Sequence, residues 1–490
     1  MSRSAAVVRT LRAGAPRHAL FLALLAVGAA LRGVTQLAYQ PALLYYDSAG
    51  YLDNAAHLRP FIVRPLGYPL FLRLLPADHD LAVIPFAQHL MGLAIAVLLY
   101  VLLLRLGVRR WLAALATAPV LLDAYQLNIE EYVLSETLFE ALLVAGAAVV
   151  LAPRSPIGAR RAAVVGLIFA AVALTRGAGA ALIVPVVLVM LVLRSRPPAL
   201  AALLIAFAVP VGAYAAWFED FHPGVYSVTG YGGQFLYARV APFADCSRVS
   251  VPARERVLCP RQPLGHRPPV EDFMWSNDSP VYALPRESRS KIAGSFARRV
   301  IRDQPLTYAH VVVAGSLRGF APIRSAHPGE LPIRRWQFRT TYPRFRSDTD
   351  ALIRQHGGDY GRVRPRFASF LRSYQSFGYA PGPLLAVCLI AALTAVVAGR
   401  WVPWPGVRAG ALMFAALGVA AIVSAVAANQ FTWRYWLPEL VLLPPAGALG
   451  ATAVAAAAAR LSADRRAADA RRPGAPQAAR EAATDGLGRR

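Results

Sequence analysis

The chain has 490 residues, of which 56% are hydrophobic and 16% charged, and its formal net charge is +25. A soluble chain of this length would carry far more charged surface. The charge is almost entirely arginine, since Lys291 is the one lysine. Much of this arginine lies at the ends of apolar runs and not on one soluble basic domain, which argues against a nucleic-acid-binding protein.

Long apolar runs follow one another along the chain and predict an all-α polytopic membrane protein with about ten transmembrane helices, because a helix of about 20 apolar residues crosses the hydrocarbon core. The predicted spans are 19–38, 81–104, 111–127, 133–152, two short spans within 162–193, then 199–217, 382–399, 409–428 and 437–459. The basic N-terminus leads into a run long enough to span, so we expect an anchor and not a cleaved signal peptide.

Short arginine-rich segments separate these spans at regular intervals. Those at 3–17, 105–110, 153–161 and 194–198 are related by an even number of crossings if 162–193 crosses the membrane twice. They then share one side, which the positive-inside rule identifies as the cytoplasm. We therefore expect both termini to be cytoplasmic.

The spans divide the sequence into four parts. These are an N-terminal transmembrane module, 1–217, with a first outer loop at 39–80; a large mixed extracytoplasmic domain, 218–381, between the seventh and eighth spans; the C-terminal spans, 382–459; and a disordered cytoplasmic tail, 460–490. The tail is assigned as disordered because it is basic and rich in Ala, Pro and Gly.

Two segments of the large outer region, 290–301 and 367–377, carry apolar residues at helical spacing. Such helices either lie flat in the headgroup layer or pack on the domain itself, and their periodicity does not separate the two. Cys246 and Cys259 lie in the same region, which we assign to an oxidising compartment. We expect them to form a disulfide, with two free thiols as the alternative.

Acidic residues occur at the outer ends of several spans. Asp47 lies a few residues beyond the first span, where a carboxylate can take a proton from a hydroxyl group or bind a metal; the alternative is a helix cap. Asp53 follows in the same loop, Glu130 and Glu131 lie in a short acidic turn, and Glu136 lies inside the fourth span. A carboxylate in lipid costs roughly 2.5 kcal/mol or more, so it needs a partner or a water-filled cavity. We expect these four to support Asp47.

Three arginines are candidate phosphate ligands, because a guanidinium binds phosphate through a bidentate fork. Arg64 lies in the first outer loop, Arg176 between two short spans, and Arg434 at the outer end of the last span. The alternative is that they anchor their helices, with Trp433 and Trp436 as part of an aromatic belt. The sequence contains no Walker A, dinucleotide-binding or HExxH motif, so nothing in it indicates use of ATP or a dinucleotide.

Five short motifs carry a resemblance to a known family. They are DSAGYL beginning at Asp47, RPLGYPLFLRLL in the same loop, SETLF opening a span, LTRGAG between two spans and RYWLPEL opening the last span. In their order and shared outer placement they resemble the GT-C superfamily of membrane glycosyltransferases. The similarity is to the bacterial polyprenyl-phosphate-sugar-dependent branch, which includes the aminoarabinose transferase and the protein O-mannosyltransferases. It covers roughly 30–215 and 430–445.

The resemblance implies an inverting transfer of a sugar from a polyprenyl phosphate to a glycan, lipid or protein acceptor. The enzyme would act on the outer face of a bacterial inner membrane, in the cell envelope. Asp47 would activate the acceptor or bind a divalent metal, Mg²⁺ or Mn²⁺, and Arg64, Arg176 and Arg434 would bind the lipid phosphate. Many members carry two adjacent acids where this chain has Asp47-Ser48, which leaves the metal requirement open.

Two other classes remain as alternatives. A transporter or a flippase for lipid-linked sugars predicts internal pseudo-symmetry or broken spans in matched halves, and we find no internal repeat. A non-catalytic scaffold would have no need of Asp47, so substitution of that residue separates it from an enzyme. The sequence leaves the sugar, the acceptor and the oligomeric state undefined.

Overall fold

The computed structural model describes residues 15–151, 157–327, 329–398 and 405–470. These residues are largely helical, and their two strands, β1 (Tyr39–Gln40) and β2 (Arg362–Val363), form one short antiparallel pair. The predicted all-α fold is therefore confirmed in its coarse form. Within 218–381, where a mixed domain is expected, the described segments are short helices and loops together with β2.

Helices occupy every predicted span. They are α2 (Ala19–Ala38), α5 (Val83–Arg105), α6 (Arg110–Leu122) followed by α7 (Ala124–Glu130), α8 (Glu136–Leu151), α9 (Ala159–Thr175), η2 (Gly177–Leu182) followed by α10 (Ile183–Val192), α11 (Pro197–Phe221), α18 (Gly382–Val397), α19 (Pro405–Ala428) and α20 (Pro438–Ala470). Among the described residues five helices are long and apolar enough to cross a membrane, namely α2, α5, α11, α19 and α20, and the bent pair α6–α7 would make a sixth. Several helices are thus able to span a bilayer, as a polytopic membrane protein requires.

The remaining helices are short and lie outside these spans. They are η1 (Ala15–His18), α3 (Tyr46–His57), α4 (Gly67–Arg73), α12 (Gly232–Val240), η3 (Ala253–Leu258), α13 (Val270–Trp275), η4 (Pro280–Ala283), α14 (Arg289–Asp303), α15 (Pro305–Leu317), η5 (Arg318–Phe320), η6 (Ile333–Trp336), α16 (Thr349–Gln355) and α17 (Pro365–Tyr374).

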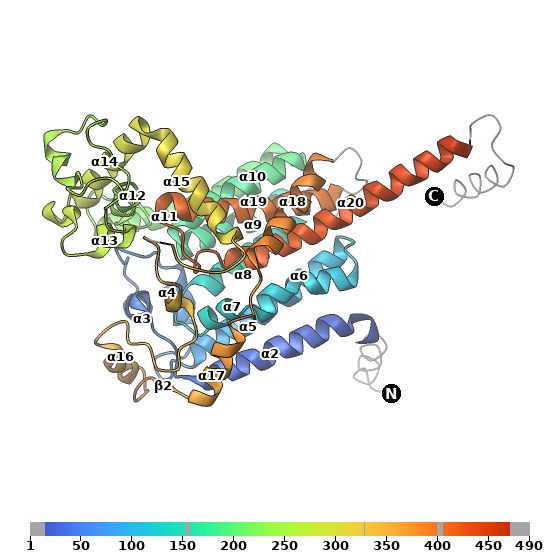
Figure 1. Cartoon of the computed structure of the whole chain (residues 1–490), viewed down its shortest axis with the longest axis horizontal. Helices are drawn as coiled ribbons and strands as arrows, with labels where there is room; N and C mark the ends of the chain where they lie inside the picture. The colour runs from blue at the N-terminus through green and yellow to red at the C-terminus, as the bar shows by residue number, and fades with distance from the viewer. Residues whose placement is uncertain (1–14, 152–156, 328, 399–404, 471–490) are drawn as a thin grey trace.

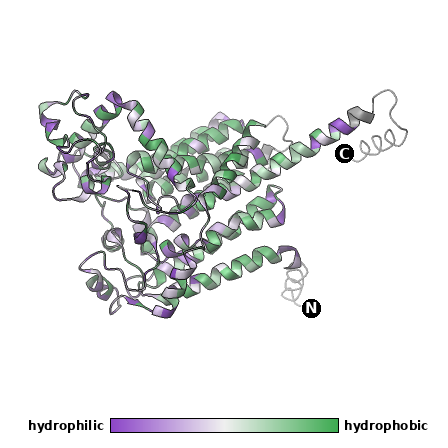
Figure 2. Cartoon of the chain, in the orientation of Figure 1, coloured by the Kyte–Doolittle hydropathy of each residue, from purple (hydrophilic) through white to green (hydrophobic). Residues whose placement is uncertain are grey.

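The long helices form a bundle whose members run in roughly the same direction (Figure 1). The start of α2 and the end of α20 lie at one end of this bundle, while α3, α12–α14 and α16 gather at the other. Apolar residues follow the long helices, and polar residues concentrate at the end that carries the short ones (Figure 2). Outward-facing side chains such as Val184 and Ile205 are 65% and 62% exposed, as expected for surfaces that meet lipid.

The region 218–381 packs in two different places. Helices α12, α13 and α14 enclose a small core of their own, in which Tyr237, Phe296 and Val300 are completely buried. Downstream, Trp336 and Leu371 belong instead to the core that contains the first outer loop. The large outer region therefore contributes both a small helical unit, α12–α14, and a cover over the first loop.

The two amphipathic segments have different surroundings. Residues 290–301 belong to α14, whose apolar face is buried in the small helical unit, so this segment packs on protein. Residues 367–377 include most of α17, which buries Leu371 and leaves Phe370 51% exposed, and Phe377 beyond its end is 74% exposed. The apolar residues of this segment are therefore only in part packed on protein, in contrast to those of α14.

Two further expectations concern the outer unit and the tail. Cys246 and Cys259 form a disulfide in the structure, which joins the loop after α12 to the end of η3. The tail was predicted to be disordered from residue 460, yet α20 continues through Ala470. This part of the prediction is wrong because 460–470 is rich in alanine and arginine, which favour a helix once α20 has started. Residues 471–490 lie outside the described residues.

Candidate functional site

The first outer loop is tied to the connection between α7 and α8. The Leu43 amide donates to the Glu131 carbonyl and the Val133 amide to the Leu43 carbonyl, both at 3.0 Å. The Ser48 hydroxyl then donates to the Val133 carbonyl at 2.9 Å. This register holds the start of α3, where Asp47 lies, beside the start of α8, where Glu136 lies.

Asp47 does not cap the helix in whose first turn it lies. The capping box at the start of α3 is made by Tyr45 and Ser48, and the Tyr45 amide donates to the Ser48 hydroxyl at 2.8 Å. The Asp47 carboxylate instead accepts hydrogen bonds from two arginines. Arg64 Nη2 lies 3.2 Å from each carboxylate oxygen, and Arg434 Nη1 lies 3.0 Å from Oδ2.

Further ion pairs extend this contact to two more elements. Arg434 Nε also donates to Glu136 Oε1, and Arg176 Nη1 donates to the same oxygen at 2.6 Å. The resulting chain of ion pairs is Arg64, Asp47, Arg434, Glu136 and Arg176, here called the Asp47 cluster. All five residues are among those predicted from the sequence, and the structure brings them together from segments up to 387 positions apart.

Close packing fixes the arginines of this cluster. Arg176 is the residue at which α9 ends and η2 begins. At the start of α4, a Cβ on Gly67 would lie 2.6 Å from the Leu174 carbonyl oxygen, so the first loop approaches the end of α9 at a distance that only glycine permits. The Arg176 guanidinium lies 5.0 Å from the centre of the Tyr435 ring, and the Arg434 guanidinium lies 5.5 Å from the centre of the Tyr45 ring.

The electrostatics of the cluster favour the ionised forms. Burial by itself would raise the pKa of Asp47, but Arg64 and Arg434 outweigh burial and lower the pKa to about 2. Asp47 raises the pKa of Arg64, and Glu136 and Asp47 together raise the pKa of Arg434, despite the burial of both arginines. Asp47 is therefore a carboxylate at every physiological pH, and a weak base.

A cavity of about 710 Å³ opens beside the cluster. Asp47, Arg64 and Arg434 line it, whereas Arg176 and Glu136 lie behind it. Its wall combines aromatic and charged side chains, including Tyr46, Phe61, Phe235, Trp275, Trp336, Glu271, Asp272, Arg335 and Arg346. Aromatic surfaces with a few converging polar groups are typical of a site for an organic ligand.

A divalent metal does not fit the geometry at Asp47. Mg²⁺ and Mn²⁺ take several oxygen ligands, yet both oxygens of Asp47 accept from guanidiniums. Within the ranges that the structure describes, no group of three His, Cys, Asp or Glu side chains is placed to hold a metal ion. We therefore derive no chemical step through a metal.

The other predicted acids lie elsewhere. Asp53 lies on the exposed side of α3 and pairs with Arg59 at 3.1 Å, with its side chain 46% exposed. Glu130 and Glu131, which the sequence places in a short acidic turn between two spans, are completely buried, Glu130 as the last residue of α7 and Glu131 directly after it. The bend of 52° between α6 and α7 turns this segment into the protein.

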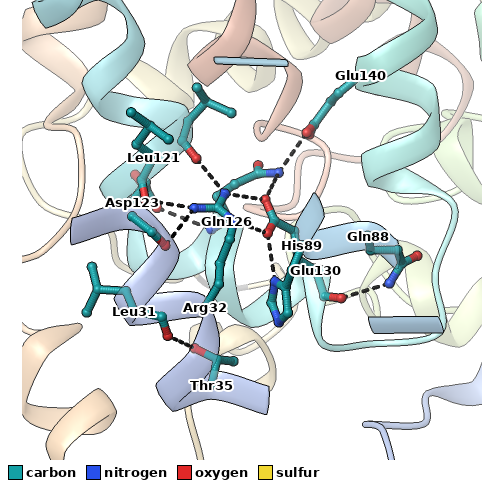
Figure 3. A network of polar contacts seen from close by, with 12 residues as sticks. Leu31, Arg32, Thr35, Gln88, His89, Leu121, Asp123, Gln126, Glu130 and Glu140 are labelled. Carbon is teal, nitrogen blue, oxygen red and sulfur yellow. Dashed lines mark hydrogen bonds and ion pairs between the residues drawn. The ribbon is translucent and has the colours of Figure 1, made fainter. Parts of the chain in front are cut away.

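Glu130 and Glu131 belong to a second polar network, and Figure 3 shows the part of it around Glu130. Arg32 Nε and Nη2 donate to the two oxygens of Glu130 at 2.8 and 2.7 Å. His89 lies between the two acids, with Nδ1 2.9 Å from Glu130 and Nε2 3.0 Å from Glu131. Gln126 connects Glu130 to Glu140 on α8. These six residues, Arg32, His89, Gln126, Glu130, Glu131 and Glu140, are here called the Glu130 cluster.

The residues that the sequence did not single out belong to the Glu130 cluster and to the cavity wall. Arg32 and His89 lie inside apolar runs, and a charged or titratable side chain there was an available signal. Glu271 and Arg335, which line the cavity, lie in a polar region without a recognisable motif, and no comparable signal marks them.

A second cavity, of about 670 Å³, lies between α6, α18 and α20 and is lined almost entirely by apolar side chains. Its one acidic residue, Asp123, is paired with Arg324 at 2.6 Å. This cavity offers room for an apolar chain and no free charged group for chemistry.

Comparisons of the chain with models of protein families, with curated proteins and with solved structures found no match. The function is therefore inferred from the Asp47 cluster and the cavity beside it.

Proposed function

We propose that this protein is a membrane glycosyltransferase of the GT-C type, which moves a sugar from a polyprenyl phosphate to an acceptor on the outer face of the membrane. One observation carries the proposal. Arg64 and Arg434 converge on Asp47 at the wall of a cavity of about 710 Å³ that also carries aromatic side chains. Arginines that face an aromatic cavity at the end of a helical bundle suit a ligand with a phosphate, a sugar and a lipid tail.

The charges suit the departure of a lipid phosphate. When the bond between the anomeric carbon and the phosphate oxygen breaks, the phosphate gains negative charge, which fixed guanidiniums stabilise. The Asp47 cluster contains three arginines and two carboxylates, so it keeps one net positive charge for the phosphate. Arg64 and Arg434 would contact the phosphate directly, while Arg176 would hold Glu136 and, through it, Arg434.

Asp47 has a positioning role in this proposal. Its oxygens hold the two arginines that line the cavity, and its low pKa makes it a poor acceptor for the proton of a hydroxyl group. Replacement of Asp47 by asparagine would remove the charge that orients both guanidiniums.

The experiment that tests the proposed function compares two substitutions on α3. Asp47→Asn is expected to reduce sugar transfer by about 100-fold or more, the usual effect of disturbing one charged contact to a developing anion. Asp53→Asn is the control, since Asp53 lies on the same helix with its side chain 46% exposed, and its activity should stay close to wild type. Transfer would be measured in nanodiscs from polyprenyl-phosphate sugars, and wild-type turnover of Asp47→Asn at equal abundance would remove the Asp47 cluster from the mechanism.

The proposal includes ten membrane crossings, with both termini in the cytoplasm and the first loop and α12–α14 outside. Two observations support this topology. Each predicted span contains a helix, and α2 starts at the same end of the helical bundle at which α20 finishes (Figure 1). Exposed positions for single cysteines are available at Gln262 and Ser462. In a Cys388→Ala background, a membrane-impermeant thiol reagent should label Gln262→Cys and spare Ser462→Cys in intact cells. The reverse pattern would overturn the orientation.

A transporter or flippase is the alternative, and the Glu130 cluster is the observation in its favour. Ionisable residues buried among membrane helices are common in ion and proton pathways. The two functions differ in their product, because transport returns the lipid-linked sugar intact whereas transfer releases polyprenyl phosphate. Mass spectrometry of the lipid after turnover would separate them.

A further inference from the structure

Part of the cavity wall comes from the small helical unit. Helix α13 contributes Glu271, Asp272 and Trp275 to the lining, and the first loop contributes Asp47 and Arg64. The cavity is therefore lined by carboxylates that do not belong to the Asp47 cluster, as well as by residues of that cluster. The unit to which α13 belongs lies outside the segments that carry the sequence motifs.

Glu271 differs from Asp47 in its partners. Asp47 accepts hydrogen bonds from two guanidiniums, whereas the one side chain that donates to Glu271 among the described residues is the neutral amide of Gln430, at 3.4 Å. Arg335, the cation that lowers the pKa of Glu271 most, lines the same cavity and donates to the Tyr45 hydroxyl at 3.3 Å. No ion pair within 4.0 Å includes Glu271 in the part of the chain that the structure describes, so its oxygens remain accessible to a ligand in the cavity.

We infer that Glu271 takes the proton from the acceptor hydroxyl group and that α13 forms the acceptor side of the cavity. This inference rests on the proposed function, since it assigns roles within the same site. The leaving phosphate would lie at Arg64 and Arg434, and the acceptor would enter between α13 and the first loop. A general base must reach the proton that it takes, and Glu271 lines the same cavity as Arg64 and Arg434.

The step is balanced as a direct displacement. The acceptor oxygen forms a bond to the anomeric carbon while the bond from that carbon to the phosphate oxygen breaks, and its electron pair leaves on the phosphate. The hydroxyl proton passes to the Glu271 carboxylate and afterwards to water at the open end of the cavity. The products are a glycosylated acceptor and polyprenyl phosphate, and no oxidant, reductant or metal takes part.

The aromatic lining near Glu271 indicates the class of acceptor. Trp275, Tyr46 and Phe61 line the same cavity. Flat apolar rings beside charged and polar groups suit a saccharide, which presents apolar C–H faces and hydroxyl edges. We therefore assign the acceptor as a sugar hydroxyl.

The charge environment supports a base at this position. Burial raises the pKa of Glu271, and Arg335 and the Gln430 hydrogen bond offset that rise only in part. Several charged groups influence or surround Glu271. They are Asp272 on α13, Asp47 and Arg64 in the first loop, Arg335 and Arg346 before α16, and Arg434 before α20. A carboxylate with a raised pKa holds a proton more strongly than Asp47 does.

The test compares Glu271→Gln with Asp278→Asn, an exposed acid of the same outer unit that does not line the cavity. Wild type and both variants would be assayed in nanodiscs with polyprenyl-phosphate mannose, glucose and arabinose as donors and octyl glycosides as acceptors. Loss of the base is expected to lower the transfer rate by about 100- to 10,000-fold. Donor binding should stay within about twofold of wild type, because the arginines that hold the phosphate are untouched.

Azide provides the readout that a structural role would not give. Azide attacks the anomeric carbon without a proton to lose, so Glu271→Ala should form glycosyl azide at nearly the wild-type rate while transfer to octyl glycosides stays low. Wild-type transfer in Glu271→Gln, or equal losses with azide and with octyl glycosides, would overturn the role of Glu271 and leave the proposed function standing. A wild-type protein that transfers none of the three sugars would overturn the proposed function itself.

Discussion

The Asp47 cluster and the Glu130 cluster are built from the same kind of ion pair but differ in how fully their arginines are used. In the Glu130 cluster, Arg32 donates to both oxygens of Glu130 and also to the carbonyls of Gly28, Val120 and Leu121. Every nitrogen of that guanidinium therefore has an acceptor inside the protein. A saturated arginine of this kind fixes helices against one another and has nothing left for a ligand.

In the Asp47 cluster, Arg64 and Arg434 each have a guanidinium nitrogen that donates to no acceptor among the described residues. Within the described residues, Arg64 donates through Nε and Nη2, and Arg434 through Nε and Nη1, so each retains one terminal nitrogen without an acceptor. Both line the cavity, whereas no residue of the Glu130 cluster does. Unused donors facing a cavity distinguish a binding site from a structural ion pair more clearly than burial does.

The largest effect is expected on stability, from Arg32→Met. This change leaves Glu130 buried without its cation, and breaking a buried pair in this way typically costs about 3–5 kcal/mol. The free energy of unfolding should fall accordingly in detergent or nanodiscs. The variant Arg32→Met/Glu130→Met should recover much of the loss because it removes both charges, and donor binding by the folded fraction should stay unchanged. Weaker donor binding would show that the Glu130 cluster takes part in function.

Arg434→Gln should show the opposite pattern, with donor binding and transfer lost. Removing one cationic contact to a developing anion lowers turnover by about 100- to 1,000-fold. Lysine at the same position should rescue only in part, since it lacks the planar fork that reaches Asp47 and Glu136 together. Arg176→Gln should weaken donor binding less, because Arg176 pairs with Glu136 behind the cavity. Titration of donor lipid into nanodiscs gives both affinities, and full activity of both glutamine variants would exclude phosphate binding here.

The sequence predicted the Asp47 cluster better than the Glu130 cluster, for a physical reason. Asp47, Arg64, Arg176 and Arg434 lie in connections between predicted spans, and the alternation of those spans predicts that these connections share one face. Glu130 is expected in a turn but is buried as the last residue of α7. The direction in which α7 turns depends on its packing, and no local sequence pattern predicts that direction. The contact of Glu130 with Arg32 joins residues 98 positions apart. The cavity wall at Glu271 depends likewise on long-range packing of short helices.

The pH dependence of transfer distinguishes the Asp47 carboxylate from that of Glu271. Asp47, with a pKa of about 2, stays ionised across any practical range. Glu271 has a pKa raised above the ordinary 4.5, so the base form is lost as the pH falls through that raised value. Transfer should then decline by about tenfold per pH unit on the acid side, as expected for one protonation. Rates measured against pH should lose this acid limb in Glu271→Gln, and an unchanged limb would assign it to another group.

The smallest effects are expected from two matched glycine substitutions, one at each cluster. A Cβ on Gly92, in α5, would lie 2.3 Å from Glu130 Oε1 and 2.7 Å from Arg32 Nη2, both fixed by the buried pair. Overpacking at such a site costs about 1–3 kcal/mol, which the better helix propensity of alanine offsets only in part. Gly92→Ala should therefore lower the free energy of unfolding without changing the turnover of the folded protein.

Gly50→Ala makes the same change beside the cavity. The added methyl would lie 2.7 Å from the edge of the Phe61 ring, and both residues line the cavity. A ring at the edge of an open space can turn aside, whereas a buried ion pair cannot, so this variant should lose less than about 1 kcal/mol of stability. The displaced ring should instead raise the KM for the octyl glycoside acceptor a few-fold, with donor affinity unchanged. Thermal unfolding and acceptor titrations on the two variants would test the contrast directly, because a structural cluster responds to an added methyl group in stability and a binding site responds in affinity.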